Sequence, residues 1–430
     1  MARFTSLTEW LKWQEGFHPR SIDLGLERAA TVYKALNPES IKPPTIIVAG
    51  TNGKGSCIAF LESIYREQGY RVGTYTSPHI LKYNERIKID GEAVSDETIC
   101  EAFERIDAVR NEVSLSYFEF GTLAAIDIFW RSELDVQLLE VGLGGRLDAV
   151  NILDSDLSLI TSIAIDHVDW LGETRDAIAY EKAGIFRTGV SAVIGDIEPP
   201  DSLIKSADKK KTPLFRIGHE FNFKKNKIGW DWSSTKPASQ KYESLPHPAL
   251  KGEHQYYNAA SVLMAVTEME THLPVSKNAI YQGLKNTKLK GRFQLIEGEK
   301  PVLLDVAHNP QAVRALFNYL TDSFSGHKIY TVFSMMKDKD IKGVIEIINP
   351  VIQEWFVSPL KNPRTASQSF MQSCFRDCGI ENTNFGYKDF SEAYMVVNKN
   401  AEKGDLILIF GSFFLVSEYL ENKDKYLGMR

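Results

Sequence analysis

The sequence predicts an α/β protein with two domains: a larger one with a Gly-rich loop and a mainly parallel sheet, and a smaller Rossmann-like α/β domain at the C-terminal end. Two observations predict this class. Short apolar runs alternate with amphipathic, helix-like segments along most of the chain, a pattern typical of parallel sheets covered by helices. In addition, 430 residues exceed what one hydrophobic core usually serves.

Five apolar runs in the first half of the chain are expected to form the strands of the larger sheet. They lie at 45–49, 72–75, 134–141, 157–163 and 191–194. Segments with helix character separate them, at about 56–68, in the apolar stretch that ends at Trp130, and at 174–184. Because such sheets bind ligands outside the carboxyl ends of their strands, the residues that directly follow these runs are candidates for a site.

Residues 205–248 break this alternation. They contain lysines at 209–211, the run KKNK at 224–227, then GWDWSS and several prolines. A basic patch is one interpretation, but charge runs most often form a solvated surface, so a hairpin-like excursion is favoured. From 252 to about 273 the pattern is helical again.

A second α/β pattern begins near residue 295. The segment 310–320 is expected to be a helix with a proline in its first turn, where the missing N–H costs nothing. The domains are therefore predicted as 1–294 and 295–430. The strands of the second domain are expected at 302–306, 329–333, 355–357 and 406–410.

The bulk composition argues against several classes of protein. A net charge of −6 gives no support to a nucleic-acid partner, which usually requires a basic surface. Four scattered cysteines without paired spacing indicate a reducing compartment. The N-terminal stretch lacks the apolar core of a signal peptide, and the longest apolar stretch, 406–416, is too short to span a bilayer. We expect a cytoplasmic monomer without a membrane partner.

The strongest functional signal is GTNGKGS at 50–56, between an expected strand and an expected helix. Glycines let backbone amides turn inward onto phosphate oxygens, and the helix N-terminus adds positive charge. Lys54 can reach the terminal phosphates of a nucleotide, and Ser56 a phosphate-bound magnesium. The match to the standard phosphate loop is imperfect, since Gly55 separates the lysine from the hydroxyl. A Gly-rich turn without a ligand is the ordinary alternative, but the strand–loop–helix context favours phosphate binding.

Three further positions follow expected strands or end an expected helix. Glu140 ends a strand before a Gly-rich turn, where a nucleotide-binding domain needs an anionic magnesium ligand. His167 follows another strand and, taken alone, is better explained as a buried histidine. Lys182 lies near a helix C-terminus, where a cation is favourable in any protein. The residues by themselves leave these roles open.

Nine stretches, in order along both domains, resemble the folylpolyglutamate synthase and dihydrofolate synthase branch of the Mur ligase superfamily, in its bifunctional bacterial type. The resemblance implies a P-loop-containing larger domain of the Mur ligase central type and a C-terminal glutamate ligase domain. The stretches are AGTNGKGS (49–56), YTSPHILKYNERI (75–87), YFEFGTLAA (117–125), LEVGLGGRLDAVN (139–151), DHVDWLG (166–172), EKAGIF (181–186), HQYYNAA (254–260), GRFQ (291–294) and DVAHNPQA (305–312).

The resemblance also implies the nucleotide and metal sites. The ATP-binding residues would be Gly53, Lys54, Gly55, Ser56, Asn258, Arg292 and Asp305. Two magnesium ions would be held by Ser77, Glu140, His167 and a carbamylated Lys182. Carbamylation would turn the lysine into a carboxylate-like anion. Lys54, Lys182 and His308 would be catalytic, the last of them near the γ-phosphate or the incoming amine.

The stretch IDLGLER at 22–28 resembles the dihydropteroate-binding segment of the bifunctional enzymes. The ordinary alternative is a loop that leads into a helix. Two other stretches fall where those enzymes contact the pterin substrate. The substrate-binding residues implied by the resemblance are Asp23, Leu24, Gly25, Ser116, Tyr117, Phe118, Glu119, Leu147, Asp148 and Ala149.

The implied function is ATP-dependent ligation of L-glutamate to 7,8-dihydropteroate and to reduced folates. A carboxylate is a poor electrophile, so ATP would first convert it to an acyl phosphate, which the amine of glutamate then attacks. Two alternatives remain. Another Mur-family amide ligase would usually carry an additional N-terminal domain, for which a loop at residue 50 leaves little room. A P-loop ATPase without ligase activity would not need the metal-ligand set or the motif at 305–312.

Overall fold

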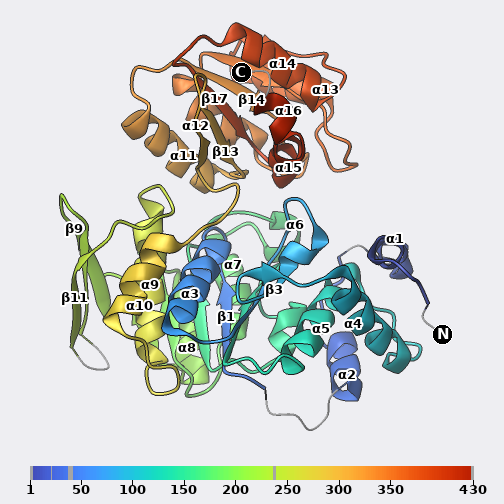
Figure 1. Cartoon of the computed structure of the whole chain (residues 1–430), viewed down its shortest axis with the longest axis vertical. Helices are drawn as coiled ribbons and strands as arrows, with labels where there is room; N and C mark the ends of the chain where they lie inside the picture. The colour runs from blue at the N-terminus through green and yellow to red at the C-terminus, as the bar shows by residue number, and fades with distance from the viewer. Residues whose placement is uncertain (1–2, 21, 37–41, 236–238, 428–430) are drawn as a thin grey trace. The chain divides into compact units, whose positions relative to one another are not determined.

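The computed structural model describes residues 3–20, 22–36, 42–235 and 239–427. The chain divides into two compact units. The first comprises Met1–Ala164, Leu171–Ala249 and Tyr256–Thr287, and the second Ile165–Trp170, Leu250–Gln255 and Lys288–Arg430. Strands and helices alternate in both units, which confirms the predicted α/β class (Figure 1). The domain boundary between residues 294 and 295 stays a prediction, and the two short segments of the second unit were not expected.

The first unit is built on an eight-stranded sheet with the order β4-β3-β2-β5-β1-β6-β7-β8. All neighbours from β2 to β8 are parallel, while β3 and β4 add an antiparallel edge. The five expected strands are present, and the mainly parallel sheet is confirmed. The strands are β1 (Thr45–Ala49), β2 (Val72–Tyr75), β3 (Ile87–Ile89), β4 (Glu92–Ala93), β5 (Val136–Glu140), β6 (Leu157–Ile160), β7 (Ala192–Ile194) and β8 (Leu214–Arg216).

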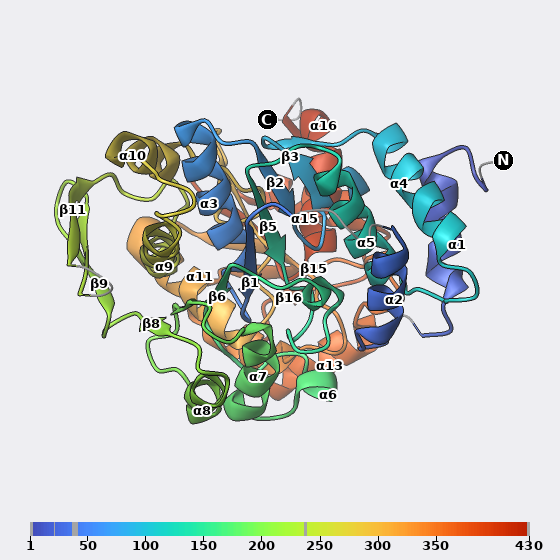
Figure 2. The same ribbon diagram turned by 90° about the horizontal axis from the view of Figure 1, so that it is seen from below.

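The central strands of this sheet are completely buried. Every residue of β1 and β5 is buried, which explains why these strands are continuous apolar runs instead of alternating patterns. Figure 2 shows α3 beside α10, and these two helices pack against each other. The helices are α1 (Leu7–Phe17), α2 (Glu27–Leu36), α3 (Lys54–Gln68), α4 (Asp96–Val109), α5 (Tyr117–Trp130), α7 (Arg175–Lys182), α8 (Asp201–Lys210) and α10 (Lys277–Asn286), with α6 (Val168–Leu171) and α9 (His254–Glu268) spanning limits between the units.

Helix α1 begins at a capping box that the sequence analysis did not use. The hydroxyl of Ser6 accepts a hydrogen bond from the N–H of Glu9, and the Glu9 carboxylate accepts one from the N–H of Ser6. This reciprocal pair satisfies two N–H groups that a helix start otherwise leaves unpaired. The helix packs on α4 and α5 through the fully buried Trp10. The N-terminal stretch is therefore part of the folded unit.

The segment 205–248 differs from the predicted hairpin-like excursion. Its first residues complete α8, and β8 then extends the main sheet in parallel with β7. The lysines at 209 and 210 lie in the last turn of α8, where positive charge is favourable. An antiparallel sheet follows, but it has three strands, and Trp230 and Trp232 are buried on one of its faces. Its strands are β9 (Phe221–Lys225), β10 (Trp230–Ser234) and β11 (Gln240–Leu245).

The second unit contains a six-stranded sheet with the order β12-β13-β17-β14-β15-β16, parallel except for the β12–β13 pair. The four expected strands are present, and the short edge strands β12 and β16 were missed. The elements are β12 (Gln294–Ile296), β13 (Val302–Asp305), β14 (Ile329–Phe333), β15 (Glu354–Val357), β16 (Thr383–Asn384), β17 (Leu406–Phe410), α11 (Pro310–Ser323), α12 (Ile341–Ile348), α13 (Gln368–Asp377), α14 (Phe390–Asn400), α15 (Phe413–Glu421) and α16 (Lys423–Leu427). Among the described helices, none combines the length and the apolar character needed to cross a membrane.

Candidate active site

The Gly-rich loop lies between β1 and α3, at the carboxyl edge of the main sheet. Gly53 is the N-cap of α3 and has a φ of +96°, a conformation that favours glycine. The end of β6 holds the loop in place. The N–H of Thr51 donates to the carbonyl of Ser162 at 2.7 Å, and the Thr161 hydroxyl donates to the carbonyl of Asn52 at 2.7 Å. The loop is therefore a fixed turn at a helix N-terminus, which is a geometry suited to phosphate.

Two of the predicted ATP-binding residues from distant parts of the chain meet at this loop. A Cβ atom at Gly53 would lie 2.5 Å from Oδ1 of Asn258, so only glycine fits against that side chain. The ammonium group of Lys54 donates to the carbonyls of Gly50 and Thr51 at 3.1 and 3.2 Å. Ser56 is buried in the first turn of α3. The first unit thus gathers Gly53, Lys54, Ser56 and Asn258 at one place.

Two predicted magnesium ligands also meet in the first unit. The N–H of Ser77 donates to Oε2 of Glu140 at 3.2 Å, and a Cβ atom at Gly55 would lie 3.7 Å from that oxygen. Carboxylate and hydroxyl oxygens are ligands that Mg²⁺ prefers, so these residues fit the predicted metal. No group of three or more His, Cys, Asp and Glu side chains is placed to hold a metal within the described part of the chain. A metal here would therefore also need serine, lysine carbamate or phosphate oxygens.

Lys182 is the last residue of α7, and its side chain is buried. The loop after β5 packs closely on the backbone beside it. The N–H of Arg146 donates to the carbonyl of Glu181 at 2.8 Å, and their side chains pair at 2.9 Å. A Cβ atom at Gly184 would lie 2.2 Å from Cα of Arg146. The position of Lys182 is therefore coupled to the loop that contains residues 147–149.

The predicted pteroyl-binding residues differ in exposure. Ser116 and Glu119 are buried and form the capping box that starts α5. Asp148 is buried, and its carboxylate accepts hydrogen bonds from the N–H groups of Leu143 and Val150. Burial raises the pKa of Asp148 to about 6. Several of these residues therefore also support the local structure.

The predicted segment 23–25 and residue 147 are in contact. The N–H of Gly25 donates to the carbonyl of Leu147 at 3.2 Å. The remaining members, Leu24, Tyr117 and Phe118, are partly exposed, and Ala149 is buried. The first unit thus brings the N-terminal segment to the loop after β5. His18, which pairs with Asp23 at 3.0 Å, is a residue of this region that the sequence analysis missed.

The second unit holds the remaining candidates. Asp305 is buried, and its carboxylate accepts hydrogen bonds from the N–H groups of Phe293 and Ala307. Burial raises the pKa of Asp305, against the lowering effect of the Arg292 charge. Arg292 lies over the ring of Phe413, with its guanidinium carbon 5.5 Å from the centroid. Because the charge of Arg292 acts on the Asp305 carboxyl group, the two residues lie near each other in this unit.

His308 and His167 lie around Asp166 in the same unit. Nδ1 of His308 contacts the carbonyl of Val306 at 2.8 Å, and Nε2 lies 3.7 Å from Oδ2 of Asp166. Lys339, which the sequence analysis missed, pairs with Asp166 at 2.5 Å and lies 3.4 Å from Nε2 of His167. Burial disfavours the ionised form of Asp166, but His308 and the charge of Lys339 outweigh it and hold its pKa well below the usual range. Ser77 and Glu140 belong to the first unit and His167 to the second.

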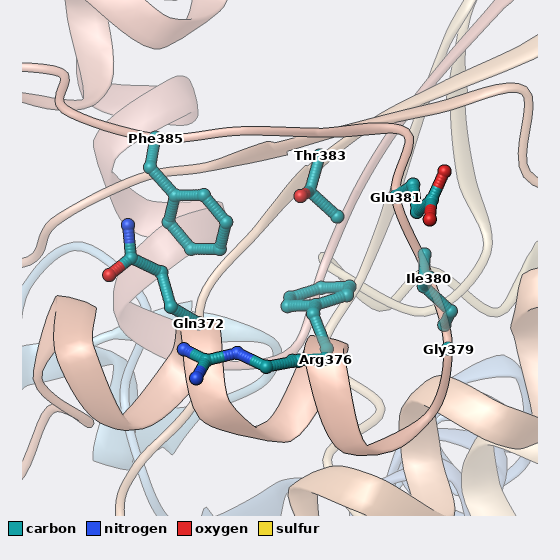
Figure 3. Close-up of a pocket in the computed structure, with 8 residues that line it drawn as sticks. Gln372, Arg376, Gly379, Ile380, Glu381, Thr383 and Phe385 are labelled. Atoms are coloured by element: carbon teal, nitrogen blue, oxygen red, sulfur yellow. The ribbon is translucent and has the colours of Figure 1, made fainter.

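An open cavity of about 430 Å³ lies elsewhere in the second unit, between α13 and the strand that follows it. Figure 3 shows Gln372 and Arg376 on the helix, with Thr383 and Phe385 on the facing segment. The residues that line it include no predicted site residue. Gln372 and Arg376 are exposed to solvent, so we assign no ligand to this cavity.

Comparison with known proteins gives matches in both units. The chain matches the Mur ligase middle domain over residues 48–266 and the Mur ligase, glutamate ligase domain over residues 291–413. It is 38% identical over 417 residues to the dihydrofolate synthase/folylpolyglutamate synthase of Escherichia coli strain K12, covering 96% of this chain and 95% of that protein. The protein of the same name from Bacillus subtilis strain 168 is 30% identical over 429 residues, with coverage of 96% and 98%.

Solved structures with the same fold extend these matches. E. coli FolC in complex with DHPP and ADP has a TM-score of 0.92 and 37% identity, covering 98% of this chain and 99% of that chain. The bifunctional folylpolyglutamate synthase/dihydrofolate synthase from Yersinia pestis, complexed with AMPPNP and Mn ion, has a TM-score of 0.90 and 39% identity, with 98% of each chain covered. The similarity therefore includes full-length structures with a nucleotide bound.

Proposed function

Since this chain belongs to the dihydrofolate synthase/folylpolyglutamate synthase family of Mur ligases, we propose that it joins L-glutamate to 7,8-dihydropteroate and to reduced folates, with conversion of ATP to ADP and phosphate. It is an amide-forming ligase, and the resemblance predicted from nine motifs is confirmed. The observation that carries this function is the loop before α3, where Gly53 packs against Asn258 beside the Glu140 carboxylate.

The nucleotide would lie with its phosphates on this loop. Lys54 and the N-terminus of α3 supply positive charge there, and Asn258 lies directly against the backbone of Gly53. Gly55 and Ser56 complete the loop, and Arg292 and Asp305 are proposed to complete the ATP site. Phosphoryl transfer is catalysed mainly by positioning and by neutralisation of charge, and these residues supply both.

Ser77 and Glu140 are proposed to hold a magnesium ion, with His167 as a further ligand. Lys182, as a carbamate, is proposed as a ligand of a second ion, which the buried position of its side chain supports. When bound, Mg²⁺ would neutralise charge on phosphate oxygens. The two divalent ions and the carbamate are proposals for this chain.

The proposed reaction has two chemical steps. In the first, a carboxylate oxygen of the pteroyl acid attacks the γ-phosphorus of ATP, the bond to the bridging oxygen breaks, and ADP leaves. In the second, the amine of glutamate attacks the acyl carbon, and the tetrahedral intermediate expels phosphate. Nδ1 of His308 contacts the carbonyl of Val306, which can only accept, so Nδ1 carries the proton of the neutral ring. Nε2, which lies 3.7 Å from Oδ2 of Asp166, is then the nitrogen that would take up a second proton. We place His308 as the acceptor of the amine proton.

The test is phosphate release by the purified full chain. One assay contains ATP, L-glutamate and dihydropteroate, and a separate assay contains ATP, L-glutamate and tetrahydrofolate. We expect release that depends on ATP, on the pteroyl acid and on glutamate together, with formation of the glutamyl amide. ATP turnover that ignores glutamate and pteroyl acids would instead identify a P-loop ATPase without ligase activity. Use of a different acid acceptor with an amino acid would identify another Mur-type amide ligase.

A further inference from the structure

Two ion pairs and one histidine–carboxylate contact link the loop between α1 and α2, through Arg28 in the first turn of α2, to Glu119 in the first turn of α5. Nε2 of His18 lies 3.0 Å from Oδ2 of Asp23. Nη1 of Arg28 lies 2.9 Å from the same oxygen, and Nη2 of Arg28 lies 3.1 Å from Oε1 of Glu119. We refer to His18, Asp23, Arg28 and Glu119 as the loop network. It spans 91 positions between Arg28 and Glu119, so it fixes a loop to a distant helix.

Both ends of the loop network are buried and anchored a second time. The side chains of His18 and Glu119 are 8% and 3% exposed. Nδ1 of His18 contacts the hydroxyl of Ser114, and Oε2 of Glu119 accepts a hydrogen bond from the N–H of Ser116 at 2.7 Å. Both serines lie in the turn that leads into α5. A buried charge is tolerated only with close partners, so this geometry has little freedom.

The loop network holds the backbone of the predicted pteroyl-binding segment. Nη2 of Arg28 donates to the carbonyl of Asp23 at 2.7 Å. Two residues later, the N–H of Gly25 donates to the carbonyl of Leu147 at 3.2 Å. Segment 23–25 is therefore held on one side by Arg28 and on the other by the loop after β5. Leu147 is itself a predicted pteroyl-binding residue, and Arg28 contacts two others, Asp23 and Glu119.

The carboxylate of Asp23 is occupied by protein partners. Oδ2 faces both His18 and Arg28, and Oδ1 lies 3.6 Å from Nη1 of Arg20. The hydrogen bond with His18 lowers the pKa of Asp23, so the carboxylate stays ionised. An anion that already has two close cationic or donor partners is poorly suited to bind another ligand. The role of Asp23 then lies in the position it gives to the backbone around it.

We propose that His18 and Arg28 are positioning residues for the pteroyl substrate: through Asp23 and Glu119 they hold segment 23–25 between Leu147 and the first turn of α5. The inference rests on the proposed function and adds two residues to it. His18 and Arg28 touch neither ATP nor glutamate in this account. Their loss should therefore affect recognition of the pteroyl acid and leave the other two substrates unaffected.

Arg28→Lys is the first test, because lysine keeps the charge but loses the planar fork that pairs with two carboxylates. In steady-state kinetics of the full chain, KM for dihydropteroate is expected to rise by about tenfold or more, with KM for ATP and glutamate and the value of kcat within about threefold of wild type. Loss of binding that is equal in the ground and transition states gives this pattern.

Arg105→Lys is the matched control. Arg105 binds Asp127, a 1%-exposed carboxylate on the same helix α5, with Nη2 2.6 Å from Oδ2, and its own side chain is 31% exposed against 27% for Arg28. It has no contact with segment 23–25 in the described structure. We expect wild-type KM values for this variant. Equal effects of both arginine variants on all three KM values would show that the loop network only stabilises the fold, and would overturn the proposal.

His18 gives an independent pair of variants that remains informative if Arg28→Lys does not fold. His18→Ala removes the contact with Asp23, and His18→Gln places an N–H donor at a similar distance. KM for dihydropteroate should rise in His18→Ala and return toward wild type in His18→Gln. Unchanged KM in folded His18→Ala would refute the proposal. Wild-type protein without ATP consumption dependent on glutamate and pteroyl acid would refute the proposed function itself, before any variant is compared.

Discussion

The N–H of Ser77 donates a hydrogen bond to Oε2 of Glu140, with 3.2 Å between the two atoms. The two residues lie 63 positions apart, but Glu140 ends β5 and Ser77 follows the end of β2, its parallel neighbour, so both lie at the same edge of the sheet. A Cβ atom at Gly55 would lie 3.7 Å from the same oxygen. The carboxylate is therefore beside both the predicted phosphate loop and the predicted serine ligand.

Glu140→Gln tests this arrangement. The amide keeps the size of the side chain and one acceptor oxygen, but it removes the negative charge that a magnesium ligand supplies. We expect ligation to fall on the order of 100-fold, and the Mg²⁺ concentration for half-maximal activity to rise. The measurement is phosphate release as a function of Mg²⁺ concentration. A variant with the Mg²⁺ dependence of wild type would contradict the assignment.

Glu62→Gln is the control for this prediction. Glu62 is a partly buried carboxyl group on α3, and burial raises its pKa. Glu62 is outside every site assigned above. We expect the Mg²⁺ dependence of Glu62→Gln to match that of wild type, so an equal change in both variants would indicate a general effect of losing a buried acid.

Several strands could be predicted to the residue because they are buried on both faces. β1 and β2 in the first unit, and β14 and β17 in the second, have the predicted bounds, and all their residues are buried. β5 is shorter at both ends than the predicted run 134–141. The apolar residues Leu134 and Val141 lie just outside the strand, and an apolar pattern does not show at which residue a strand ends.

The elements that could not be predicted depend on tertiary packing. Edge strand β16 has two partly exposed residues, Thr383 and Asn384, which carry no apolar pattern. The segment 205–248 was interpreted from its lysine runs, its GWDWSS stretch and its prolines, although the lysines at 209 and 210 end a helix. Charge by itself does not distinguish a helix terminus from a loop.

The residues of the candidate site also differ in whether a local pattern of the sequence predicts them. The Gly-rich loop could be predicted because its function depends on a local pattern of residues. Lys339 could not, because its partner Asp166 is 173 positions away. His18 was missed for the same reason, since its partner Ser114 lies 96 positions away. Arg28 was included only as part of the stretch 22–28, and its pairing with Glu119, 91 positions away, was not foreseen. A single sequence contains no signal for such pairs.

Lys182 provides a test of the proposed carbamate. Lys182→Arg keeps the positive charge but cannot form a carbamate, and Lys182→Ala removes the amine. We expect ligation to be lost in both variants, by at least about 100-fold, with unfolding midpoints close to wild type for Lys182→Arg. Isotope-labelled bicarbonate should give a carbamate NMR signal in wild type and none in either variant. An active Lys182→Arg variant, or a wild-type protein without the signal, would disprove the modification.

Gly184 tests the packing beside Lys182. A Cβ atom there would lie 2.2 Å from Cα of Arg146, so Gly184→Ala must displace backbone. We expect destabilisation of about 1–3 kcal/mol and a raised KM for the pteroyl acid, because the displaced loop contains residues 147–149. Urea unfolding measures the first effect and steady-state kinetics the second. Wild-type stability of Gly184→Ala would show that the loop can shift freely.

Gly16 offers the matched comparison for Gly184. It lies inside α1, and a Cβ atom there would have nothing within 4 Å. Gly16→Ala should therefore stabilise the protein by roughly 0.5–1 kcal/mol, because alanine loses less backbone freedom in a helix. Opposite signs for the two substitutions in the same unfolding experiment would separate close packing from helix propensity.

Asp148 should make the stability of the first unit depend on pH. Burial raises its folded pKa to about 6, while an unfolded aspartate has a pKa of about 3.9. Between these values the folded state binds more protons than the unfolded state, so the free energy of unfolding falls as pH rises from about 4 to about 6, and then stays level. The shift corresponds to a fall on the order of 3 kcal/mol in the free energy of unfolding.

Asp148→Asn removes this titration, and the difference in unfolding free energy between wild type and variant cancels the contribution of other groups. Urea unfolding over this pH range should therefore show wild type losing stability relative to Asp148→Asn as pH increases, and a difference that is constant with pH would mean that the Asp148 carboxyl group titrates at its ordinary value.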